Sequence, residues 1–208
     1  MKKILAIGPH PDDLEFGCGG TLLELAADKF DISLLVMTGG EYGGDAQIRK
    51  KEQEFSAKVL RASLFWGGFK DTELPSGREV INCAEKMISK IKPDLIFCNY
   101  PQDTHQDHRN TAQAVITAAR YASNLIFYEV PTSINFSPDI FSDIGAVLEK
   151  KTRLLRCHKS QVNKTRVENL SIIESAKSAA IFRGYQARVK YAEGFKAQRM
   201  LFNSFICR

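Results

Sequence analysis

Two short stretches of the chain bring together the side chains that could do chemistry. Residues 8–15 read Gly-Pro-His-Pro-Asp-Asp-Leu-Glu, and residues 99–110 read Asn-Tyr-Pro-Gln-Asp-Thr-His-Gln-Asp-His-Arg-Asn. Three of the four histidines, His10, His105 and His108, fall within them. A lone histidine is more often a satisfied core or surface residue, but three histidines among carboxylates are the donor set that a divalent metal takes. The two stretches therefore predict one metal centre, provided that the fold brings them together.

A catalytic zinc ion usually takes three protein ligands from histidine and carboxylate and keeps one position open for water. His10, Asp13 and His108 can supply one such set. Because neighbouring residues in an extended loop point in different directions, Asp12 and Asp13 should not share a role. If Asp13 turns to the metal, Asp12 can face the bound water and take its proton.

The roles of the other polar residues in these stretches stay open on the sequence alone. His105 and His108 are three residues apart, so one helical turn would place them on one side, where one could bind the metal and the other reach the substrate. Asp107 could hold an imidazole nitrogen and set its tautomer. Glu15 could support the metal site from behind or favour the start of the following helix. No role is assigned to His158, the fourth histidine.

The elements that must position these stretches alternate between strand and helix. Short apolar runs bounded by glycine or proline predict buried strands, and apolar residues at helical spacing predict helices. The predicted strands are residues 3–8, 31–38, 64–66, 95–98 and 125–130, and the predicted helices are residues 21–29, 48–61, 79–91 and 111–122. Beyond residue 130 the alternation loosens, with helices predicted over 147–158 and 166–182 and short strands over 141–144, 191–195 and 200–205.

Repeated alternation with strands that are apolar on both sides predicts an α/β fold, a mostly parallel sheet with helices on both faces. No repeat, low-complexity tract or linker interrupts the 208 residues, so a single domain spanning 1–208 is expected. In such sheets ligands bind outside the carboxyl ends of the strands. Both polar stretches directly follow predicted strands, which places them on the same edge of the sheet.

The composition disfavours several classes of protein. With 44% hydrophobic and 25% charged residues the chain is typical of a globular protein. The net charge of +5 is mild and basic residues do not cluster, so no nucleic-acid partner is expected. The five cysteines are scattered without a Cys-x-x-Cys pair, which disfavours a disulfide framework and a thiolate zinc site. Apolar runs are too short for a signal-peptide core or a membrane span, so a cytoplasmic location is expected.

Gly17, Gly19 and Gly20 raise a nucleotide-binding alternative. Their spacing is not Gly-x-Gly-x-x-Gly, and no Gly-Lys-Ser/Thr follows them. Close approach of the first helix to the edge of the sheet is therefore the preferred interpretation of these glycines.

The motifs resemble those of a known family, the PIG-L/LmbE-like zinc-dependent de-N-acetylases. Residues 9–15, with Gly17 and Gly20-Thr21 after them, look like its first motif, and residues 105–108, His-Gln-Asp-His, match its second, His-x-Asp-His. Residues 38–43 are similar to its Thr-x-Gly-Glu-x-Gly loop, and residues 49–52 to its Arg-x-x-Glu helix. Since residues 158–161 and 191–195 also look like late segments of the family, the resemblance covers most of the chain.

The resemblance implies a Rossmann-like fold, one zinc ion per chain and hydrolysis of an N-acetyl group, usually from an N-acetylglucosamine unit. The implied zinc ligands are His10, Asp13 and His108. Asp12 becomes the general base, and His105, oriented by Asp107, becomes the group that stabilises the oxyanion or protonates the leaving amine. The implied contacts to the sugar are Glu41, Arg49 and Asp71.

Other functions stay open on the sequence. A metal-dependent hydrolase of an ester or phosphoester would use the same residues, and a non-catalytic protein could keep zinc to brace its loops, although structural zinc sites are usually closed by four ligands. Arg49 and Glu52 could instead form a surface pair on a helix. Residues 131–165 are expected to form part of the wall that selects the small-molecule N-acetylated sugar or glycoconjugate. The sequence decides neither the identity of that sugar nor whether the chain forms a homo-oligomer.

Overall fold

A seven-stranded sheet forms the centre of the computed structural model, which describes residues 2–201 and 203. The strands are β1 Lys3–Gly8, β2 Asp31–Thr38, β3 Ser63–Phe69, β4 Leu95–Asn99, β5 Leu125–Tyr128, β6 Ile140–Asp143 and β7 Ala192–Arg199. The helices are α1 Asp13–Gly17, α2 Gly19–Ala27, α3 Ala46–Leu60, α4 Arg78–Ile91, α5 Gln106–Ala118, α6 Leu148–Leu155 and α7 Ile172–Ala187, with a short 3-10 helix, η1, at Glu41–Gly43. The prediction of an α/β fold is confirmed.

The sheet has the strand order β3-β2-β1-β4-β5-β7-β6. Its first five strands run parallel, whereas β7 lies antiparallel to both β5 and β6. From β1 the chain builds β2 and β3 on one side and then returns to build β4 and β5 on the other. The direction of winding therefore reverses between β1 and β4, which is the point at which open α/β sheets bind their ligands.

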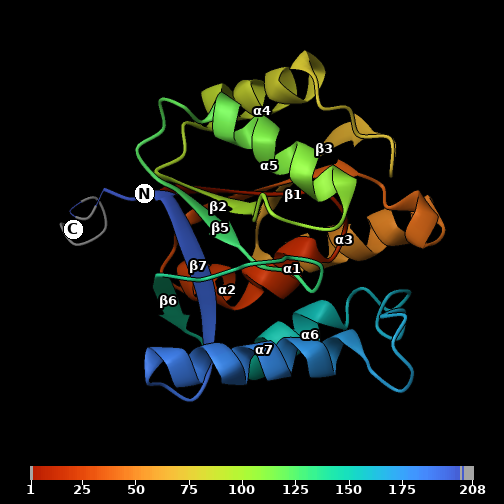
Figure 1. Cartoon of the computed structure of the whole chain (residues 1–208), viewed down its shortest axis with the longest axis vertical. Helices are drawn as coiled ribbons and strands as arrows, with labels where there is room; N and C mark the ends of the chain where they lie inside the picture. The colour runs from red at the N-terminus through yellow and green to blue at the C-terminus, as the bar shows by residue number, and fades with distance from the viewer. Residues whose placement is uncertain (1, 202, 204–208) are drawn as a thin grey trace.

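Helices cover both faces of the sheet (Figure 1). Helices α4 and α5 pack on one face, and α1, α2, α3, α6 and α7 pack on the other. The side chains of β1 alternate between these two layers, since Ile4 and Ala6 belong to one apolar cluster and Leu5 and Ile7 to the other. Among the described residues, no helix has the length and apolar character needed to cross a membrane.

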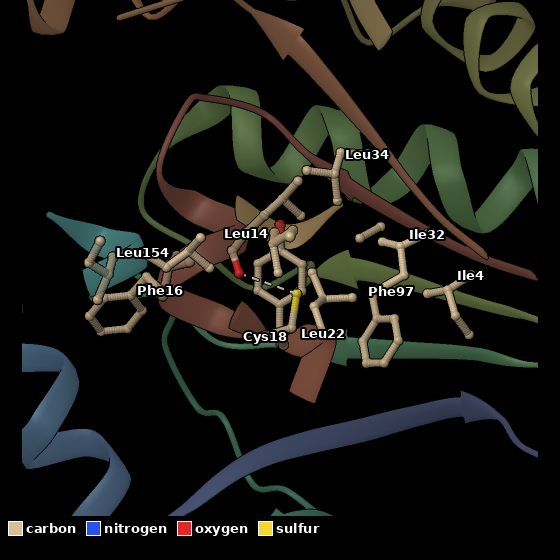
Figure 2. Packing of buried hydrophobic residues seen from close by; sticks show 14 of the residues in the cluster. Ile4, Leu14, Phe16, Cys18, Leu22, Ile32, Leu34, Phe97 and Leu154 are labelled. Atoms are coloured by element: carbon tan, nitrogen blue, oxygen red, sulfur yellow. Dashed lines mark hydrogen bonds between the residues drawn. The ribbon is translucent and has the colours of Figure 1, made fainter. Parts of the chain in front are cut away.

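The larger apolar cluster lies directly beneath the first polar stretch. Figure 2 shows Leu14 and Cys18, in and just after α1, gathered with Leu22 of α2 and Phe97 of β4. All four side chains are buried, and the Cys18 thiol donates a hydrogen bond to the carbonyl of Leu14 over 3.3 Å. Burial of one side of α1 therefore anchors the polar loop of residues 9–13 at the end of β1.

Several boundaries differ from those that the sequence predicts. Helix α5 begins at residue 106 rather than 111, because His105 caps its first turn. Helix α7 begins at residue 172 rather than 166, because Ser171 and Glu174 form a capping box there. Strand β3 extends to Phe69, beyond the predicted end at residue 66, and α1 was not predicted. Residues 202, 204 and 205 of the strand predicted over 200–205 lie outside the described residues.

Candidate active site

The two polar stretches meet at the carboxyl edge of the sheet, as their places after β1 and β4 predict. His10 follows β1, and His108 lies in the first turn of α5, which follows β4. Their imidazole nitrogens, Nδ1 of His10 and Nε2 of His108, lie 3.2 Å apart. Both rings are buried, with exposed fractions of 6% and 4%. The structure thus brings together side chains that are 98 residues apart in the chain.

Three atoms at this point form a nearly equilateral triangle. The Oδ2 atom of Asp13 lies 3.3 Å from His10 Nδ1 and 3.4 Å from His108 Nε2, and the two nitrogens are 3.2 Å apart. Zinc binds nitrogen and oxygen at about 2.0–2.1 Å, which places neighbouring ligand atoms of a tetrahedral site about 3.3–3.4 Å apart. The spacing of His10, Asp13 and His108 therefore fits a zinc ion.

Carboxylates stand behind both histidines of this triangle. Nε2 of His10 lies 3.0 Å from Oδ1 of Asp71 and 3.2 Å from Oδ2 of Asp107. Nδ1 of His108 lies 3.2 Å from Oδ2 of Asp103. Histidines that bind metals usually donate their other ring N–H to a carboxylate in this way, which fixes the tautomer that leaves the first nitrogen free.

The same carboxylates make the site strongly negative. Burial lowers the pKa of His10, but hydrogen bonds with Asp107, Asp13 and Asp71 outweigh it and raise that pKa well above its ordinary value. His10 also forms alternative close groups, one with Asp71 and Asp107 and one with His105 and His108. In the first group, His10 would have to bind the metal through Nε2. That nitrogen faces Asp71 and Asp107, so it could not then donate a hydrogen bond to either carboxylate. The site as a whole has the donors and the field that a divalent cation requires.

Asp12 stands beside the triangle in an unusual backbone conformation. Its φ of 93° lies in the left-handed region that non-glycine residues rarely adopt. Its backbone N–H donates to Oε1 of Gln53 over 3.3 Å, and its Oδ2 lies 3.4 Å from Nη2 of Arg49. Burial raises the pKa of the Asp12 carboxyl to about 6, against the opposing charge of Arg49. A carboxylate with a raised pKa at the edge of a metal site is suited to accept a proton.

His105 is placed by its role as the N-cap of α5. Its Nδ1 accepts a hydrogen bond from the backbone N–H of Asp107 over 3.2 Å, which leaves the ring proton on Nε2. Its ring centroid lies 4.7 Å from that of His10. Burial and the neighbouring His10 and His108 lower the pKa of His105. His105 therefore presents a neutral imidazole whose Nε2–H can donate a hydrogen bond.

Some of the predicted roles do not match the positions that the structure shows. The side chain of Asp107 faces His10 and accepts from the backbone N–H of Thr72 over 2.7 Å, so its carboxylate does not orient His105. Asp71 is 3% exposed and also faces His10, rather than an opening in which a sugar could bind. Glu41 accepts from the backbone N–H of Asp71 over 3.0 Å. These carboxylates brace the loops after β2, β3 and β4, because the chain turns them inward.

Arg49 and Glu52 are not a surface pair. Arg49 is 5% exposed and donates to the backbone carbonyls of Gly40 and Pro11 over 2.6 and 2.7 Å. Glu52 accepts from the backbone N–H and the hydroxyl of Ser160 over 2.8 and 2.6 Å. Arg49 therefore ties together the loops after β1 and β2, and Glu52 ties α3 to the segment after α6.

Glu15 and His158, which have no role from the sequence, lie together in the interior. Oε2 of Glu15 is 3.4 Å from Nε2 of His158, and both residues are almost fully buried. Oε1 of Glu15 accepts from Nε2 of Gln53 over 2.7 Å and from Oγ of Ser56 over 2.5 Å. Gln53, Ser56 and Asp103 are not among the predicted site residues, although Asp103 belongs to the second polar stretch.

A cleft of 270 Å³ opens onto the triangle. It is lined by Asp12, Asp13, His105 and His108, together with Phe16, Val130, Pro131, Thr132, Gln161, Lys164, Thr165 and Ile172. The predicted substrate wall, residues 131–165, therefore contributes at both of its ends. Hollows of 410 to 580 Å³ lie elsewhere on the surface of the described residues, and no histidine lines them.

Comparison with known proteins finds one family and several relatives. A sequence profile of the family described as GlcNAc-PI de-N-acetylase, PIG-L, matches residues 5–119. The chain is 31% identical to the diacetylchitobiose deacetylase of Thermococcus kodakarensis over an alignment of 223 residues, which covers 94% of this chain and 83% of the relative. It is 34% identical to an uncharacterized deacetylase of Escherichia coli, YaiS, over 76% of this chain and 91% of the relative. The structure of N,N'-diacetylchitobiose deacetylase from Pyrococcus horikoshii, in complex with its inhibitor MPG, matches with a TM-score of 0.85 at 30% identity, over 97% of this chain and 85% of that one.

Proposed function

Because this chain belongs to the PIG-L family of GlcNAc-PI de-N-acetylases, we propose that it is a zinc-dependent hydrolase that removes the acetyl group from an N-acetylated amino sugar. The observation that carries the proposal is the triangle of ligand atoms with a carboxylate and a neutral imidazole beside it, at a cleft. The names of the relatives, which refer to GlcNAc-PI and to diacetylchitobiose, support the class of substrate. We further propose that residues 1–208 act as one deacetylase domain.

His10, Asp13 and His108 would hold the zinc ion, with His10 and His108 oriented by the carboxylates behind them. When bound, zinc supplies a Lewis acid and lowers the pKa of a water molecule from near 16 to about 7. Three protein ligands leave a position for that water, which separates this site from a structural zinc site closed by four ligands.

Asp12 performs the proton transfers, and His105 supplies a hydrogen bond. Asp12 takes a proton from the attacking water, whose oxygen forms a bond to the carbonyl carbon of the acetamide. His105 donates a hydrogen bond from Nε2 to the carbonyl oxygen as negative charge develops there, an effect worth about 3 kcal/mol per donor in other hydrolases. The C–N bond then breaks, the leaving nitrogen receives from Asp12 the proton that Asp12 took from the water, and the products are acetate and a free amine.

The walls of the cleft would contact the part of the substrate beyond the acetyl group. The cleft lining includes Pro131 and Thr132 from the segment after β5, and Gln161, Lys164 and Thr165 from the segment after α6. Arg49 and Asp71 act through the loops and the histidine that they hold, rather than by touching the sugar. Glu41, which supports Asp71, acts in the same way.

Metal analysis combined with a screen for released acetate tests the proposal. The screen covers N-acetylated mono- and disaccharides, with ester and phosphoester substrates as the alternative arm. Asp12→Asn should keep the metal and lose about 10²- to 10⁴-fold in turnover, whereas Asp13→Ala and His108→Ala should lose the metal. Full activity of Asp12→Asn would remove it as the base, and unchanged metal content in the other two variants would refute the ligand assignment. Phosphate release without acetate release would assign the alternative reaction.

A further inference from the structure

A buried chain of polar side chains runs from the backbone of Asp12 into the interior. Gln53 of α3 is the link, because its Oε1 accepts from the backbone N–H of Asp12 over 3.3 Å and its Nε2 donates to Glu15 over 2.7 Å. Glu15 in turn lies 3.4 Å from His158, which follows α6. Gln53, Glu15 and His158 are 0%, 0% and 1% exposed, so solvent cannot replace any of these contacts.

The far end of this chain is the contact between Glu15 and His158, which is electrostatic. Neither nitrogen of His158 has a hydrogen-bond partner within the described residues, and the same is true of Oε2 of Glu15. The contact between the two side chains is therefore an ion pair of buried groups rather than an ideal hydrogen bond. Burying polar groups without hydrogen bonds costs free energy that apolar side chains of the same size would not cost. The presence of Glu15 and His158 here therefore points to a role in the neighbouring site.

The near end of the chain acts on a strained residue. Asp12 has a φ of 93°, and its own side chain makes no capping hydrogen bond to α1. A non-glycine residue persists in this region only where its surroundings over-determine it. Two side chains of α3 hold it, Gln53 at the backbone N–H and Arg49 at the carboxylate. Arg49 also binds other loops, whereas the side-chain hydrogen bonds of Gln53 within the described residues go to Asp12 and Glu15.

We propose that Gln53, Glu15 and His158 are positioning residues that hold Asp12 in its left-handed conformation, and so aim its carboxylate into the cleft while Asp13 turns to the metal. This inference rests on the proposed function, in which Asp12 is the base. None of the three residues lines the cleft, so they act through Asp12 and not on the substrate. His158 closes the chain from a distant segment, which makes the position of Asp12 depend on the packing of residues after α6.

Two variants and one control test this inference. Gln53→Met removes both hydrogen bonds of the link at similar size, and His158→Gln removes the charge at the far end. Ser56→Ala is the matched control, because Ser56 is equally buried and bonds the same oxygen of Glu15 but does not contact Asp12. Hydrogen–deuterium exchange of residues 9–14 is measured in metal-free protein, so that the first readout does not depend on activity. Metal content, kcat and KM are then measured in the metal-loaded protein.

Gln53→Met should speed exchange in residues 9–14 and lower kcat by about 10- to 100-fold, with metal content and KM close to those of the wild type. His158→Gln should move both readouts in the same direction, and Ser56→Ala should move neither. Wild-type exchange in both test variants, or the same kcat loss in Ser56→Ala, would overturn the inference. In an Asp12→Asn background the Gln53→Met change should cost nothing further, and an additive loss would show that it acts elsewhere. A wild-type protein that releases no acetate would refute the proposed function, and the exchange experiment would still decide whether Gln53 holds Asp12.

Discussion

Replacing Lys151 by methionine should lower the unfolding temperature markedly, because the change strips the counter-ion from a buried carboxylate. Nζ of Lys151 lies 2.6 Å from Oε1 of Glu193 and donates to the carbonyl of Phe16 over 2.6 Å. The side chains of Lys151 and Glu193 are 4% and 3% exposed. Methionine keeps most of the length and apolar surface of lysine, so the loss would come mainly from the charge.

The expected loss of stability depends on the hydrogen bonds that Glu193 keeps in the Lys151→Met variant. It still accepts from the backbone N–H groups of Gly20 and Thr21, over 2.8 and 2.7 Å, and from the Thr21 hydroxyl over 2.6 Å, all at the start of α2. Removing one partner of a buried ion pair costs about 3–5 kcal/mol, and these three donors place the expected loss near the lower end. For a chain of this length, about 2–4 °C per kcal/mol converts 3 kcal/mol into a shift of about 6–12 °C.

Thermal and urea denaturation of the purified variants measure this shift. Lys177→Met is the control, because Lys177 lies 3.4 Å from Glu149 with side chains that are 39% and 70% exposed, and its loss should cost less than about 1 kcal/mol. A double variant, Lys151→Met with Glu193→Gln, should recover part of the stability because no buried charge is left unpaired. Equal stability of Lys151→Met and the control would show that burial of this pair does not make Lys151 important for stability.

Three further predictions follow from single contacts. Asp103→Asn should weaken metal binding by about 10- to 100-fold because the negative charge behind His108, a proposed ligand, is lost, and unchanged affinity in chelator competition would contradict it. His158→Gln should lower the free energy of unfolding most below about pH 6.5. Burial lowers the pKa of His158 but Glu15 outweighs burial and raises it, so the stabilisation is lost as the pH rises through the folded value, and urea titrations that show no such decline would refute this. Gly17→Ala should destabilise the fold by about 3 kcal/mol, because a β-carbon there would overlap the buried ring of Tyr128, and a wild-type melting temperature would rule this out.

The fold and the meeting of the two polar stretches could be predicted because both depend on local patterns. Strands buried on two faces read as short apolar runs, and the order of strands and helices is enough to place loops at the carboxyl edge of a parallel sheet. His10 and His108 come within 3.2 Å because β1 and β4 are neighbours, which requires no knowledge of side-chain packing. The glycines after the first stretch also follow this logic, since Gly17 lies against the ring of Tyr128.

Which carboxylate faces which imidazole could not be predicted. Asp107 faces His10 instead of His105, and Asp71 faces His10 instead of the cleft. A shift of one residue in a loop turns each following side chain in another direction. A helix that begins five residues earlier, as α5 does, likewise gives its side chains different neighbours. Asp103 shows the same limit, because nothing in its spacing distinguishes the carboxylate behind His108 from the others in that stretch.

Helix α3 carries a signal that the sequence does offer. Its buried residues are Arg49, Gln53, Ser56, Ala57 and Leu60, a single stripe at helical spacing. The first half of this stripe is polar and the second half is apolar. On the sequence alone, Arg49 and Glu52 could form a solvated pair on one helix, and that alternative is wrong because Arg49 belongs to the buried stripe. A polar half of an otherwise apolar stripe has to face something polar, and in this protein it faces the loop of Asp12 and the carboxylate of Glu15. The change from polar to apolar residues along the inner stripe of α3 therefore identifies Gln53 and Ser56. These residues mark the side of α3 that supports the site.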